Sequence, residues 1–169
     1  CSSDLTQSGK RVVQAGFELS EYVMPGLGGR DMSTPHAVDS AAAINDIGPH
    51  FTRLRSLGIR ARTPLLNQVE KGKFIAAAEE QIVAEIRLFV EKLEDCSTTL
   101  VSDHMLNLLP EVEGRLPEEK SAVLSVLDRF LALEPSEQQI FVVGRRAGLM
   151  WRLEQRKQPQ ARRAAQELI

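Results

Sequence analysis

Cysteine is scarce in this sequence of 169 residues, which contains only Cys1 and Cys96. Two cysteines cannot build a disulfide framework, and neither belongs to a C-x-x-C pair. We therefore interpret Cys96 as a small apolar residue that opens a strand. Cys1 stands where a newly translated chain carries Met, so we expect a truncated or processed chain.

A strong charge of one sign and long apolar runs are also missing. The formal net charge is −2 and the sequence pI is near 6.0, which excludes a global attraction to nucleic acid or acidic membranes. No apolar run approaches the roughly 20 residues of a membrane helix. The first residues also lack the basic and apolar segments of a signal peptide. We expect a soluble, cytoplasmic protein with no membrane partner.

The sequence does contain an alternation of helical and extended patterns. The expected elements, in chain order, are a helix over residues 4–15, a strand over 17–24, a helix over 33–47, a strand over 51–59, helices over 63–69 and 76–94, a strand over 97–105, and helices over 117–133 and 136–157. Strands that alternate with helices favour βαβ units and a parallel sheet. Right-handed crossovers then place the helices on the outside.

Three strands are too few to close a barrel or to form a doubly wound sheet. The expected fold class is therefore α/β, as the C-terminal half of a partial TIM-type barrel with parallel strands. This half barrel is assigned to residues 1–110. Because only helices are expected after Pro110, residues 111–169 are assigned to a helical C-terminal extension.

Polar side chains gather where each expected strand ends, which is where parallel sheets carry their functional groups. These residues are Ser20, Glu21 and Tyr22 for the first strand, Arg53, Arg55, Ser56 and Gly58 for the second, and Ser102, Asp103 and His104 for the third. Asp103 and His104 lie where a general acid or base would lie, although capping or hydrogen bonding would also explain them.

Arg53 and Arg55 point to the same face of their strand, because side chains repeat every two residues there. Two guanidiniums in a central parallel strand need carboxylate partners or an anionic ligand, because unpaired buried charge is costly. Glu18 or Glu21 on the neighbouring strand could pair with them. Alternatively, the two arginines would hold the carboxylate of a substrate or cofactor.

Three further patterns are weaker. The glycines at 26, 28 and 29 resemble a phosphate cradle, but Asp31 stands where that fingerprint needs another glycine, so a tight turn is favoured. The 3 histidines have no metal-ligand spacing, so no metal ligand is expected in this chain. Residues 145–163 carry seven basic residues, one acid and Trp151, which is typical of a nucleic-acid patch or of a solvated helix face.

Several segments resemble a known family. GFELSEYVMPGLGG at residues 16–29, NDIGPHFTRLR at 45–55 and TPL at 63–65 resemble the later barrel strands of radical S-adenosylmethionine (SAM) enzymes. The similarity is to the group that includes oxygen-independent coproporphyrinogen oxidases and Elongator-type catalytic subunits. VSDHMLNLLP at 101–110 and GRR at 144–146 look like the C-terminal region of that group, so the resemblance covers nearly the whole chain.

The resemblance implies a six-stranded partial barrel that holds a [4Fe-4S] cluster through a C-x-x-x-C-x-x-C loop. The cluster binds SAM and cleaves it to a 5′-deoxyadenosyl radical. This chain has neither that motif nor a glycine-glycine-glutamate segment for the methionine amine. We therefore expect a fragment of an oxidoreductase-like radical SAM enzyme whose partner is the missing N-terminal half of the barrel. Alone, the fragment should hold no cofactor, be inactive and self-associate through an unprotected strand edge.

The resemblance also implies roles for the residues at the strand ends. Ser20 or Glu21 would contact the SAM ribose, and Ser56 and Gly58 would lie at the adenine. Arg53 and Arg55 would line the lumen below, and Asp103 and His104 would face the substrate. The alternative is a non-catalytic α/β binding module, whose basic C-terminal helix contacts a protein or nucleic-acid partner.

Overall fold

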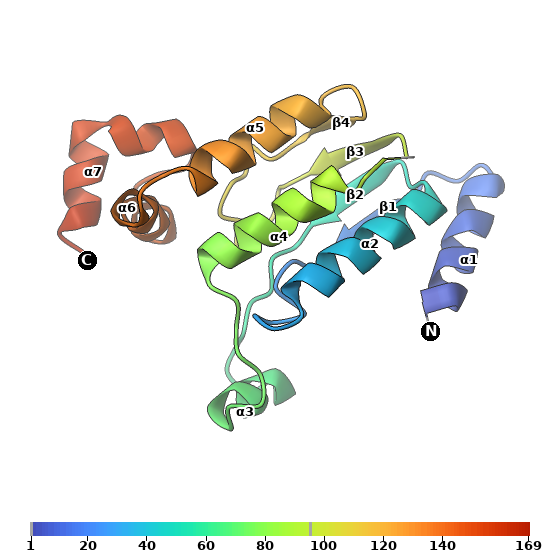
Figure 1. Cartoon of the computed structure of the whole chain (residues 1–169), viewed down its shortest axis with the longest axis horizontal. Helices are drawn as coiled ribbons and strands as arrows, with labels where there is room; N and C mark the ends of the chain where they lie inside the picture. The colour runs from blue at the N-terminus through green and yellow to red at the C-terminus, as the bar shows by residue number, and fades with distance from the viewer. Residues whose placement is uncertain (1, 95) are drawn as a thin grey trace.

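The computed structural model describes residues 2–94 and 96–169, and Figure 1 shows their arrangement. Its elements in chain order are α1 (Ser2–Gln14), β1 (Ser20–Val23), α2 (Ser33–Ile47), β2 (Phe51–Leu54), α3 (Pro64–Glu70), α4 (Glu79–Glu91), β3 (Thr98–Val101), β4 (Gly114–Leu116), α5 (Lys120–Leu131), α6 (Pro135–Arg146), the 3-10 helix η1 (Leu153–Lys157) and α7 (Pro159–Gln166). The helices and strands alternate as far as β3, as the sequence predicts.

The four strands form one open sheet in the order β1-β2-β3-β4. Strands β1, β2 and β3 are parallel, and β4 is antiparallel to β3. Ser20 lies beside Phe51, which lies beside Thr99. The prediction of an α/β fold with three parallel strands is confirmed.

Helices α2, α4 and α5 lie side by side over one face of the sheet (Figure 1). The strand side chains on that face are buried, because strand residues alternate between the two faces. They include Val23, Leu54, Leu100 and Leu116, which belong to one apolar core with the helices. Its burial is the main source of stability for the domain.

Side chains on the opposite face of the sheet stay in contact with solvent. Ser20, Phe51, Arg53 and Thr99 are only partly buried, and Tyr22 is 62% exposed. We call this side the open face. A parallel sheet normally has both faces covered, so the open face is the unusual surface of this fold.

Two expectations for the C-terminal part are wrong. A strand, β4, follows Pro110 and pairs with β3, so this part is not purely helical. The single helix expected over 136–157 is broken, because α6 ends at Arg146 and Gly148 adopts a left-handed φ of 73°. Glycine adopts that conformation without strain, and the chain then continues into η1.

The strands are also shorter than the alternating patterns predict. β1 starts at Ser20, β2 ends at Leu54 and β3 ends at Val101. The residues predicted to extend them lie in loops at the strand ends. Within the described residues, none of the helices has the length and apolar content needed to cross a membrane.

Candidate functional site

A charged cluster lies on the open face at the carboxyl ends of β2 and β3. Arg53 donates from Nη1 to Oδ2 of Asp103, and Arg55 donates from Nη1 to Oδ1 of the same carboxylate, both at 2.7 Å. The prediction that Glu18 or Glu21 pairs with these arginines is therefore wrong. One acid from the loop after β3 joins Arg53 of β2 and Arg55, which directly follows β2.

Two aromatic rings extend this cluster. The guanidinium carbon of Arg55 lies 5.1 Å from the ring centre of Tyr22, and that of Arg53 lies 5.8 Å from the ring centre of Phe51. Arg53 also donates from Nε to the hydroxyl of Ser20 at 3.2 Å. Aromatic faces attract guanidinium groups, so these contacts help to hold both arginines on the open face.

The register decides which of Ser20 and Glu21 belongs to the open face. Glu21 lies beside Thr52, which is fully buried on the helix-covered side. Ser20 lies on the other side, where it contacts Arg53. Burial raises the pKa of Glu21 above its ordinary value, because a desolvated carboxylate is less stable. Ser20 is therefore the residue of this pair that a ligand on the open face can reach.

Asn107 joins β2 and β3 beyond the last paired residues. Its side chain donates to the carbonyl of Leu54 and to the hydroxyl of Ser102, and it accepts from the N–H of Ser56, each at 3.0 Å. The regular pairing of the two strands ends at Arg53 and Val101. The buried amide therefore replaces main-chain pairing just where the charged cluster begins. Asn107 was not among the expected site residues, although a lone amide within the apolar run 106–109 is a usable signal.

Ser56 and His104 each carry a buried polar atom that has no hydrogen-bond partner in the described part of the chain. These atoms are the hydroxyl of Ser56 and Nδ1 of His104. Burial lowers the pKa of His104, and the positive charges of Arg55 and Arg60 lower it further, against the opposing effect of Asp103. These effects disfavour the protonated form of His104, and no hydrogen bond joins its ring to Asp103 within the described residues.

Gly58 packs against the end of a neighbouring side chain. A Cβ atom at this position would lie 2.6 Å from Cδ1 of Leu106, so a larger residue would require the leucine side chain to move. The residue is exposed, so its backbone could still meet a ligand.

The glycine loop after β1 serves the fold itself. A Cβ atom at Gly28 would lie 2.8 Å from the carbonyl oxygen of Met32, and one at Gly29 would lie 2.7 Å from that of Ile75. The close approach is to the protein backbone, which favours the tight turn over the phosphate cradle.

Glu85, a buried acid on α4, holds this loop in place. Its carboxylate accepts from the N–H of Gly26 at 3.0 Å and from the hydroxyl of Ser33 at 2.6 Å, and it lies 2.8 Å from Nδ1 of His36. Ser33 therefore does not cap α2, whose N-cap is Met32. His36 is partly buried beside Glu85.

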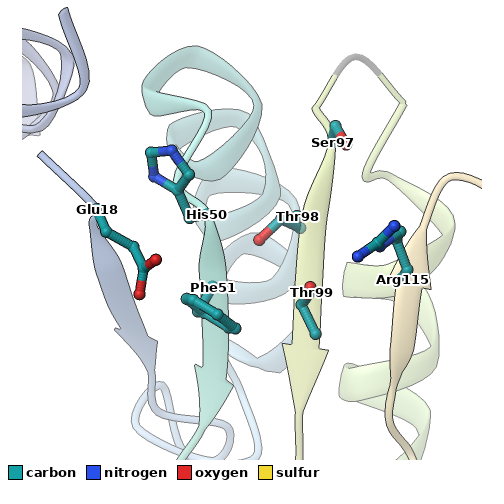
Figure 2. A pocket seen from close by; sticks show the side chains of 7 residues that line it. All are labelled: Glu18, His50, Phe51, Ser97, Thr98, Thr99 and Arg115. Carbon is teal, nitrogen blue, oxygen red and sulfur yellow. The ribbon is translucent and has the colours of Figure 1, made fainter. Parts of the chain in front are cut away.

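A shallow pocket of about 250 Å³ lies at the other end of the sheet, at the amino ends of β2 and β3 (Figure 2). Glu18 and Arg115 reach toward its floor from the outer strands, and Phe51 and Thr99 form the floor (Figure 2). The amino ends of parallel strands carry stability more often than chemistry. The charged cluster at the carboxyl ends is therefore the better candidate site.

The basic residues of the C-terminal part are largely used within the fold. Arg145 is buried, with its guanidinium carbon 4.1 Å from the ring centre of Trp151. Arg146 pairs with Glu79 through Nε at 2.7 Å, and Arg162 pairs with Glu137 through Nη1, also at 2.7 Å. A nucleic-acid patch would need such groups free.

The structure brings together Ser20, Arg53, Arg55 and Asp103, and it separates Glu21 from them. Among the described residues, no group of three or more His, Cys, Asp or Glu side chains is arranged to hold a metal ion. In comparisons with known protein families, with curated proteins and with solved structures, nothing matches this chain.

Proposed function

We propose that the open face is part of the lumen of a partial barrel in a radical SAM enzyme, to which this chain contributes the later strands. The observation that carries the proposal is the one-sided cover of the sheet. Helices α2, α4 and α5 lie on one face (Figure 1), and the charged cluster lies on the other. In a barrel of this type helices lie outside and functional groups lie at the carboxyl ends of the strands.

The described residues fit a nucleoside cofactor in part. Ser20 presents a hydroxyl on the open face, and Ser56 has a buried hydroxyl without a partner in the described part of the chain. Glu21 does not fit, because it lies on the helix-covered side. Bound SAM would supply radical chemistry, and Ser20 would help to orient its ribose. The backbone of Gly58 would lie near the adenine.

The described residues do not fit an iron–sulfur cluster. Cys96 is buried, and no cysteine set accompanies it in the sequence. We therefore assign no step to a cluster within this chain, and the cluster-binding strands would come from another part of the enzyme.

The test is to express the complete natural reading frame that encodes this chain, and to measure 5′-deoxyadenosine formation from SAM under reducing, anaerobic conditions. We expect formation that depends on a C-x-x-x-C-x-x-C motif elsewhere in the polypeptide. Ser20→Ala should raise the KM for SAM about threefold to tenfold, the cost of one hydrogen bond. Ser125→Ala, an exposed position on α5, is the control. Absence of the motif and of 5′-deoxyadenosine would refute the proposal.

The alternative, a non-catalytic binding module, receives less support. Its recognition surface was the basic C-terminal segment, and Arg145, Arg146 and Arg162 of that segment contact Trp151, Glu79 and Glu137. A measured affinity of the isolated chain for RNA or for an acidic peptide would favour it.

A further inference from the structure

Asp103 occupies the place of a ligand between two arginines. Each of its carboxylate oxygens accepts one hydrogen bond, from Arg53 on one side and from Arg55 on the other, both at 2.7 Å. Each arginine donates one charge-assisted hydrogen bond, and the two bonds converge on the two oxygens of one carboxylate. The structure thus contains a carboxylate seated on two converging donors.

The backbone of the two arginines is paired with neighbouring chain segments, whereas the acid lies in a loop. Arg53 lies within β2, and the N–H of Arg55 donates to the carbonyl of Val23 at 2.9 Å. Asp103 lies two residues beyond the end of β3, and its side chain is 45% exposed. A partly exposed ion pair of this kind adds little to stability, so an incoming anion can compete with Asp103.

The two arginines carry more positive charge than Asp103 alone can neutralise. Two guanidiniums face one carboxylate, and the positive charge of Arg60 also acts on the neighbouring His104. Arg55 makes one side-chain hydrogen bond within the described residues, and its remaining nitrogen atoms are not buried. Donors are therefore available before Asp103 moves.

We propose that Arg53 and Arg55 form a binding site for the carboxylate of a ligand, and that Asp103 is an internal competitor which this ligand displaces. The assignment of that ligand as the substrate rests on the proposed function, whereas the anion site itself does not. Tyr22, over which Arg55 lies, would flank the bound ligand. The carboxylate is favoured over a phosphate because the site already fits a planar, two-oxygen group.

The experiment titrates the 169-residue chain with succinate, by calorimetry and by NMR of the arginine Nε–H groups. We expect weak binding that shifts the resonances of Arg53 and Arg55. Asp103→Asn removes the competing charge in a side chain of the same shape, and it should tighten binding about tenfold. Arg55→Gln should abolish the binding.

The matched control is Asp128→Asn, which removes the same charge from an exposed pair with Arg87 on the helical layer. It should leave the affinity for succinate unchanged. Equal affinity in the wild type, Asp103→Asn and Arg55→Gln chains would refute the site. Tighter binding of inorganic phosphate than of succinate would refute the carboxylate assignment. Because the titration needs no cluster, it can succeed when 5′-deoxyadenosine formation fails, and the reverse also holds.

Discussion

Replacing Asn107 by alanine should separate the ends of β2 and β3. The residue is 1% exposed, and its side chain makes hydrogen bonds to Leu54, Ser56 and Ser102. Ser102 keeps a second partner, because its hydroxyl donates to the carbonyl of Leu109. In Asn107→Ala, the carbonyl of Leu54 and the N–H of Ser56 lose the side-chain amide as their hydrogen-bond partner, and both residues are buried.

Each buried polar group left without a partner costs about 1–3 kcal/mol. With two such groups, we expect Asn107→Ala to lower the free energy of unfolding by about 2–6 kcal/mol. That is a large fraction of the about 5–15 kcal/mol that stabilises a typical domain. Asn107→Asp should be at least as harmful, because it replaces the donor amide by an acceptor and buries a charge.

Urea unfolding followed by circular dichroism measures this difference as a shift of the midpoint at constant slope. Asn67→Ala is the control, because Asn67 is exposed on α3 and should change the free energy of unfolding by less than about 0.5 kcal/mol. A loss below about 1 kcal/mol for Asn107→Ala would show that the amide does not join the strand ends.

Three further predictions concern titratable side chains. Glu21→Gln should stabilise the fold at pH 7 and lose this advantage toward pH 4, because burial raises the pKa of Glu21 and so penalises its ionised form. Urea unfolding of both chains at the two pH values measures the difference in stability, and an equal difference at both would contradict the prediction. NMR titration should give His104 a pKa below its ordinary value, and Arg55→Gln should raise that pKa by removing a positive neighbour; an unchanged pKa would exclude the coupling. Glu85→Gln should cost about 2–3 kcal/mol, because Glu85 holds the loop after β1, whereas Glu80→Gln at an exposed position of α4 should cost little; similar midpoints in urea would refute the role of Glu85.

The parts of the fold that depend on local periodicity could be predicted from the sequence. α4 buries Val83, Ile86, Phe89 and Val90 on one side, which is the three- and four-residue spacing of a helix. Gly16 ends α1 with a left-handed φ of 82°, as a glycine after a helix predicts.

The remaining features depend on contacts between distant residues, which periodicity does not report. β4 has three residues, too few to show an alternation, and only its pairing with β3 defines it. Ser33 looks like a helix cap locally, but Glu85, far along the chain, takes its hydroxyl. The carboxylate partner of Arg53 and Arg55 was expected on the neighbouring strand, whereas it lies in the loop after β3.

The antiparallel strand β4 gives the sheet a direction of growth. It occupies the free side of β3, so a further parallel strand can join the parallel set only beside β1. Any larger arc built on this sheet would extend from β1 and would stop at β4. The charged cluster of Arg53, Arg55 and Asp103 would then lie near the β4 edge, where such an arc stops. The β1 edge would be the one at which strands could be added.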